Sequence, residues 1–117
     1  MKYLALIYGD EQAWDAMSEQ EQQAVYDQHS VFHERAGDKI VKGAETAASN
    51  AATTVRRRNG QTQVTDGPYA ETKEQLGGFY VFECGSESEA LELAKQVPGF
   101  DRGVVVVVQP EYVEASS

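Results

Sequence analysis

The sequence predicts an α+β fold of the ferredoxin-like βαββαβ type, an antiparallel sheet covered by two helices on one face, with an inserted β-hairpin. Three observations predict it. Two capping-box sequences mark helix starts. An Asn-Gly dipeptide between two short extended segments is typical of a tight hairpin. Four apolar or β-branched runs have the length of strands: 3–8, 40–44, 78–84 and 104–108.

The first helix follows the strand at 3–8 after an acidic stretch, 10–17, that we expect to be irregular. Ser18 and Glu21 form a capping box, because the serine oxygen accepts a free N–H of the first turn and the glutamate reaches back. The helix should run from about residue 19 to 36 and end at Gly37. Its apolar stripe consists of Val25, Phe32 and Ala36.

The middle of the chain contains the inserted hairpin. Residues 45–52 are mostly Ala, Ser, Thr and Asn without apolar periodicity, which favours a flexible connection after the short strand at 40–44. Residues 53–58 and 61–65 flank Asn59-Gly60, a pair that tolerates the positive φ angles of a type I′ turn.

The second half repeats the order of strand, helix and strand. The apolar strand at 78–84 follows a Gly77-Gly78 pair that is typical of a bulge or a close backbone approach. Ser86 and Glu89 form the second capping box and open a helix to about Val97. The valine run at 104–108 is the last strand, and residues 111–117 should be a frayed tail.

Composition excludes several classes of function. The 117 residues suffice for a single domain, 1–117, and the net charge of −9 disfavours binding to nucleic acid or to anionic membranes. The single cysteine, Cys84, excludes an internal disulfide and favours a reducing compartment. We find no secretory signal and no apolar run long enough to span a membrane, so a cytoplasmic protein is expected.

The strands at 3–8, 78–84 and 104–108 are apolar on both faces, whereas two right-handed crossovers place both helices on one face. The uncovered face would expose a large apolar patch, which monomers rarely tolerate. A homodimer that packs sheet against sheet covers it. Alternatively, the hairpin or residues 45–52 fold over this face of the same chain.

The segment Thr65–Tyr80, TDGPYAETKEQLGGFY, resembles the signature of the YCII-related, DGPF-type family, and the opening MKYL through YGDE is similar to that family's start. The likeness covers nearly the whole chain. It implies a dimeric α/β barrel. The family is mostly uncharacterised; relatives include a dehydrochlorinase-like domain, the wider superfamily includes isomerases and monooxygenases of small aromatic compounds, and some members lie beside extracytoplasmic-function sigma factors.

The resemblance also implies an acid/base pair, because similar proteins carry a histidine on the first helix and an aspartate in a cleft. These positions match His29 and Asp66. From the residues alone, His29 could equally be a histidine at the edge of the core, and Asp66 a turn cap before Gly-Pro. Tyr69 replaces the usual phenylalanine of the motif; we expect Tyr69 and Phe79 to contact substrate, with residues 66–76 as a lid.

Two functional hypotheses follow. In the first, a cofactor-independent, lyase- or isomerase-like enzyme uses His29 and Asp66 to move a proton on a small aromatic or enol-like molecule. In the alternative, the protein is a non-catalytic module that binds a ligand or a protein and is linked to transcription regulation, with Arg56–Arg58 as a contact surface. His29 and His33 have metal-binding spacing, but no further ligands complete a site, so we expect neither metal nor cofactor.

Overall fold

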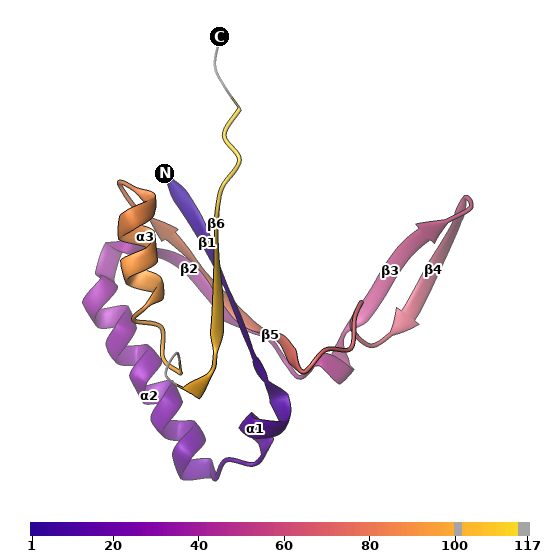
Figure 1. The fold of residues 1–117 in the computed structure, drawn as a ribbon, viewed down its shortest axis with the longest axis horizontal. Helices are drawn as coiled ribbons and strands as arrows, with labels where there is room; N and C mark the ends of the chain where they lie inside the picture. The colour runs from indigo at the N-terminus through magenta and orange to yellow at the C-terminus, as the bar shows by residue number, and fades with distance from the viewer. Residues whose placement is uncertain (100–101, 115–117) are drawn as a thin grey trace.

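The computed structural model describes residues 1–99 and 102–114. Its main sheet is antiparallel, with the strand order β2-β5-β1-β6, and a separate β3–β4 ribbon projects from it (Figure 1). The predicted ferredoxin-like arrangement with an inserted hairpin is therefore confirmed. The strands are β1 (Lys2–Asp10), β2 (Ile40–Glu45), β3 (Thr53–Arg58), β4 (Gln61–Asp66), β5 (Glu74–Glu83) and β6 (Val105–Pro110).

Helix α2 spans Glu19–Ala36, as predicted. Its capping box is complete, because the Glu21 N–H donates to the Ser18 hydroxyl and the Ser18 N–H donates to the Glu21 carboxylate. Helix α3 spans Glu87–Ala94 and ends earlier than predicted. The N–H groups of Gln96 and Val97 bond carbonyls three residues back, so the chain tightens into turns before Pro98.

Two segments are more ordered than the sequence suggests. A short helix, α1 (Glu11–Asp15), begins where irregular chain was expected, because the Asp10 carboxylate accepts the N–H groups of Gln12 and Ala13. The connection expected to be flexible contains a turn of 3₁₀-helix, η2 (Ser49–Ala51). The Glu11 carboxylate accepts the Ser49 N–H at 2.7 Å and also its hydroxyl, so side-chain bonding holds this segment.

One hydrophobic core lies between the sheet and helices α2 and α3. Alternate residues of β1 and β5 point into it, together with side chains of α2 and α3. The core is rich in aromatic contacts, with the Phe32 and Tyr80 rings edge to face at 5.3 Å and the Tyr80 and Phe82 rings stacked. Its fully or nearly buried members are Tyr3, Ala5, Phe32, Ala36, Tyr80, Phe82, Cys84, Ala90, Leu93 and Val97.

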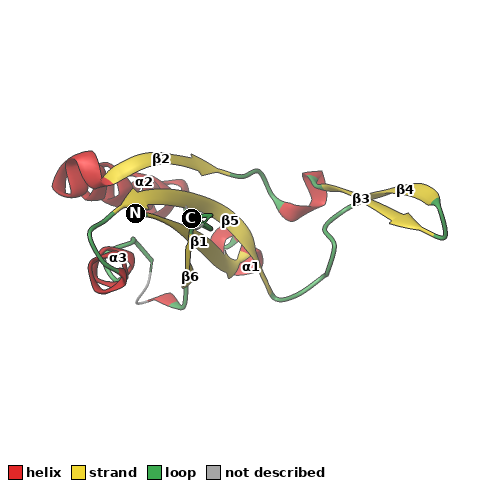
Figure 2. Cartoon of the chain, turned by 90° about the horizontal axis from the view of Figure 1, so that it is seen from above, coloured by secondary structure: helices red, strands yellow, loops and turns green. Residues whose placement is uncertain are grey.

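The opposite face of the sheet is apolar, and the hairpin does not fold over it but extends away from the sheet (Figure 2). Leu6 lies between Phe79 on β5 and Val107 on β6 in this face. Val107 is 41% exposed and Leu4 is 36% exposed. We refer to the residues Leu4, Leu6, Leu76, Phe79, Val81, Val105 and Val107 as the open face.

Strand β5 begins at Glu74, four residues before the predicted start, because a bulge lets it continue past the glycine pair. Ile7 pairs with Gly78 and Tyr8 with Leu76, which leaves Gly77 as the extra residue. At Gly78, a Cβ atom would lie 2.7 Å from the Ala44 carbonyl oxygen. The sequence-predicted bulge and close approach are both present.

The β3–β4 ribbon, hereafter the arm, has the predicted turn, with φ of 52° at Asn59 and 79° at Gly60. The ribbon projects from the end of the main sheet (Figures 1 and 2). Its extensive contacts are between its own two strands. The arm is therefore a two-stranded element without a core of its own.

Candidate functional site

His29 lies on α2 with its ring half-buried against the sheet. Its Nδ1 atom is 2.6 Å from the Tyr80 hydroxyl, which reaches it from β5. The two rings are tilted by 32°, and the exposed His33 ring meets Tyr80 edge to face at 5.3 Å. Tyr80 thus lies at the centre of a cluster that also includes both histidines of the chain.

Gly43 on β2 makes this arrangement possible. A Cβ atom at this position would lie 2.8 Å from Cδ1 of Tyr80, closer than nonbonded carbon atoms approach. In the sheet register Gly43 pairs with Tyr80 itself. The missing side chain therefore leaves space for the phenol ring over β2, from which its hydroxyl reaches His29.

A second phenol–polar contact extends the cluster along α2. The Tyr26 hydroxyl donates to the Glu45 carboxylate at 2.8 Å, which raises the pKa of Tyr26. Trp14, on α1, contacts the Tyr26 ring edge to face at 5.7 Å. Helices α1 and α2 and the end of β2 thus meet one helical turn away from His29.

Burial controls the protonation of the central pair. It lowers the pKa of His29, with a smaller lowering from His33 and a counteracting effect of Glu45. Burial also raises the pKa of Tyr80 to about 12. At neutral pH the pair therefore consists of a neutral imidazole and a protonated phenol.

Either neutral tautomer of His29 fits this contact. The Tyr80 hydroxyl can donate to an unprotonated Nδ1 or accept from Nδ1–H. Within the described part of the chain, the hydrogen bond at Nδ1 is the one that the ring makes. Nε2 is then the atom left to exchange a proton with a bound molecule.

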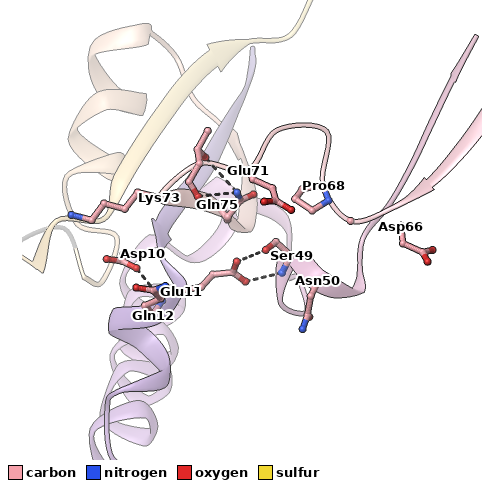
Figure 3. Close-up of a pocket in the computed structure, with 12 residues that line it drawn as sticks. Asp10, Glu11, Gln12, Ser49, Asn50, Asp66, Pro68, Glu71, Lys73 and Gln75 are labelled. Carbon is pink, nitrogen blue, oxygen red and sulfur yellow. Dashed lines mark hydrogen bonds between the residues drawn. The ribbon is translucent and has the colours of Figure 1, made fainter. Parts of the chain in front are cut away.

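Asp66 does not contact His29 within one chain. It is the exposed last residue of β4, and it lines an open hollow of about 640 Å³ at the base of the arm. Figure 3 shows Asp66 on the arm, apart from Glu11 and its hydrogen bonds to Ser49. His29 does not line this hollow. The predicted acid/base pair is therefore not assembled by the single chain.

Tyr69 is 80% exposed and lies under the Arg56 guanidinium, 5.3 Å from its carbon to the ring centre. It lines a neighbouring hollow of about 550 Å³ together with Tyr8 and Leu76. Segment 66–76, predicted to be a lid, contributes to both hollows. Phe79 precedes Tyr80 on β5 and belongs to the open face, on the side of the sheet away from His29.

The thiol of Cys84 is not part of the hydrogen-bonded cluster around Tyr80. Cys84 is buried, and burial raises its pKa, which keeps the thiol protonated and unreactive at neutral pH. The part of the chain that the structure describes contains no group of three or more His, Cys, Asp or Glu side chains placed to hold a metal. Among the described helices, none is long and apolar enough to cross a membrane.

Tyr80, Gly43 and Glu45 are site residues that sequence reasoning missed. A signal existed for Tyr80, since it shares the inward parity of Phe82 on the strand that neighbours β2. No local pattern marks Gly43 or Glu45, because their roles arise from sheet register and helix placement.

The model of the YCII-related domain family matches residues 1–110. The chain belongs to the YCII-related family. An uncharacterized protein of Rhizobium meliloti (strain 1021) is 39% identical over 99 residues, which cover 83% of this chain and 80% of that protein. Family membership agrees with the resemblance noted in the sequence.

This YCII-related protein is also similar to a solved structure, 5-chloro-2-hydroxyhydroquinone dehydrochlorinase from Burkholderia phenoliruptrix AC1100 in complex with 2,5-dihydroxybenzoquinone. The match has a TM-score of 0.57 and 18% identity, and it covers 96% of this chain and 94% of the other. At this identity the likeness shows the fold alone, which agrees with the predicted α+β arrangement.

Proposed function

We propose that this protein is a cofactor-independent enzyme that moves a proton on a small hydroxylated ring or enol, with His29 as the proton-transfer group. The observation that carries the proposal is the 2.6 Å contact between His29 Nδ1 and the Tyr80 hydroxyl. Tyr80 is then a positioning residue that holds the imidazole, the task that a carboxylate performs in many histidine sites.

The chemical step needs only acid/base groups. A substrate O–H or activated C–H gives its proton to Nε2 of the neutral ring while Nδ1–H donates to the Tyr80 oxygen. The imidazolium returns the proton to a different substrate atom, and the protein ends unchanged. The lowered pKa of His29 supports this role, because it keeps the ring unprotonated and ready to accept at neutral pH.

The proposed substrate class rests on two observations. Aromatic rings surround the histidine, with Tyr80 and His33 in mutual contact, and flat ligands stack well in such surroundings. The dehydrochlorinase of the same fold was solved with 2,5-dihydroxybenzoquinone, a small hydroxylated ring. That compound is therefore the first probe.

We also propose that the protein acts as a homodimer formed through the open face. Leu76 and Val105 are 39% and 43% exposed there, beside Leu4 and Val107. A contiguous apolar surface of this kind on an otherwise acidic chain favours burial against its own copy.

Proton transfer is tested by deuterium exchange at the ring C–H of 2,5-dihydroxybenzoquinone in D₂O, followed as loss of the proton NMR signal. We expect the wild-type protein to accelerate exchange and His29→Gln to lower the rate by about 100-fold, the lower range for general acid–base catalysis. Gln28→Ala, on the exposed side of the same helix, is the matched control and should exchange as wild type.

Equal acceleration by wild type and His29→Gln would overturn the proposal. If the wild-type protein neither accelerates exchange nor gains thermal stability from the probe, the enzyme proposal for hydroxylated rings is wrong. The non-catalytic module is then the better interpretation, and the exposed Arg57 and Arg58 of the arm support it.

Within a single chain Asp66 does not reach His29. Any direct role of Asp66 in proton transfer would therefore come from the arm of the second subunit. Asp66→Asn tests this part separately. A loss of exchange activity similar to that of His29→Gln assigns Asp66 a direct role, whereas unchanged activity limits the residue to the turn before Gly67 and Pro68.

A further inference from the structure

The two faces of the arm differ in chemistry. Directly paired residues of an antiparallel ribbon share a face, so the Val55–Val64 pair lies on one side. On the same side, the pair Thr53–Asp66 lies toward the base and the pair Arg57–Thr62 toward the tip. This face, the valine face, is an apolar centre between a carboxylate and a guanidinium.

The valine face is exposed on an element that has little stability of its own. Val55 and Val64 are 65% and 67% exposed. Isolated two-stranded hairpins are marginally stable in water, and natural ones usually pack against another surface. No other element of the described chain covers the Val55–Val64 pair, although apolar pairs of this kind are usually buried.

The base of the arm is nevertheless held in place. The Gly67 N–H donates to the Ala52 carbonyl at 2.7 Å, and the Thr54 hydroxyl donates to the Gly67 carbonyl at 2.8 Å. Glu11 ties Ser49 to α1 just before the arm begins. The direction of the arm is therefore set before any partner binds, which lowers the entropic cost of docking.

Charge indicates which partner fits. The arm contains three consecutive arginines, Arg56–Arg58, and one carboxylate, Asp66. The whole chain carries 19 acidic and 10 basic residues, so the rest of the molecule is strongly acidic. A second copy of this chain is acidic, which suits Arg57 on the valine face, and it carries exposed apolar side chains, which suit Val55 and Val64.

We infer that the arm is an intersubunit contact surface, which docks its valine face on a second copy of this chain and places Arg57 of that face against that copy's carboxylates. The inference rests on the proposed homodimer and adds a second contact to it. In a two-fold symmetric dimer each subunit gives one arm and receives one, so both arms are buried at once.

Two neighbouring residues of β4 provide the test. Val64→Lys places a charge on the valine face, and Gln63→Lys places the same charge on the opposite face of the same strand. Both positions are exposed in the single chain, so neither substitution disturbs the core. Sedimentation velocity should show a dimer dissociation constant about tenfold higher for Val64→Lys and close to wild type for Gln63→Lys.

A second measurement locates the arm directly. A photo-cross-linker attached at Val64→Cys should join two copies of the chain, whereas the same reagent at Gln63→Cys should give much less dimeric product. Wild-type dissociation constants for Val64→Lys, or equal weakening by both lysine variants, would overturn the inference. So would an arm that cross-links only to a different protein.

Failure of the inference is distinguishable from failure of the homodimer. If the wild-type protein sediments as a monomer, both the proposed homodimer and the arm contact are wrong. If the wild-type protein is a dimer that Val107→Lys dissociates but Val64→Lys does not, the open-face interface is supported and only the arm contact is wrong.

Discussion

The Tyr80 hydroxyl and Nδ1 of His29 lie 2.6 Å apart, joining the third strand of the main sheet in sequence order to its longest helix. The contact couples a phenol whose pKa is raised to about 12 with an imidazole whose pKa is lowered. Both shifts have burial as their leading cause, so the pair is electrically neutral at physiological pH. The neutral imidazole of such a pair can accept a proton from a bound molecule without first releasing one to solvent.

Tyr80→Phe should keep the fold and impair the site. The ring still fills the space over Gly43, while the hydrogen bond to His29 is lost at a cost of about 1 kcal/mol in the free energy of unfolding. We expect slower deuterium exchange than in wild type and an altered pH profile, because the imidazole is no longer held. Urea unfolding and the exchange assay measure the two effects; a wild-type pH profile would contradict the positioning role.

Gly43→Ala should disturb the same contact by a steric route. The added methyl group meets the Tyr80 ring at 2.8 Å, and overpacking of this kind costs about 1–3 kcal/mol. Gly9→Ala is the matched control, because its Cβ would meet Val104 at an ordinary 3.8 Å. Thermal unfolding compares the variants. Equal melting temperatures would show that β2 shifts enough to accommodate the methyl group.

Stability should depend on pH through His29. Its pKa is lower in the folded protein than the ordinary 6.5, so below that pH the unfolded chain binds a proton more readily than the folded one. The contribution of the neutral ring to stability is therefore present above about pH 6.5 and lost as the pH falls through the folded-state pKa.

The comparison of wild type with His29→Gln isolates this contribution. As the pH falls below 6.5, unfolding measurements should show that wild type loses more stability than the variant. Gln28→Ala should follow wild type. Parallel pH curves for wild type and His29→Gln would mean that the His29 pKa is the same in both states.

Val107→Lys should convert the proposed dimer to a monomer. Val107 lies beside Leu6 in the open face, and a buried, unpaired ammonium group at a sheet-to-sheet interface is strongly unfavourable. Leu91→Lys is the matched control, since Leu91 is 42% exposed and Val107 41%, but Leu91 lies on helix α3. Light scattering distinguishes the outcomes, and a dimeric Val107→Lys variant would place the interface elsewhere.

The sequence by itself determined the elements whose signals are local. The Ser18–Glu21 capping box and Gly37 defined α2 to the residue, and Asn59-Gly60 defined the hairpin turn, because caps and positive φ angles depend on neighbouring side chains and backbone. Apolar residues at both parities of β1 and β5, together with the right-handed crossovers that put both helices on one face, likewise indicated that one apolar face of the sheet stays uncovered by the helices.

Only the tertiary structure decided which side chains meet across elements. The His29–Tyr80 contact requires a helix seated over β5 and a glycine in the register of β2, and no local pattern encodes that combination. Asp66 shows the converse, because the family resemblance implied a role beside His29, whereas Asp66 ends β4 of the arm and lines a hollow that does not include His29. Pairing over long sequence separations is set by the packing of the whole core, which short motifs do not specify.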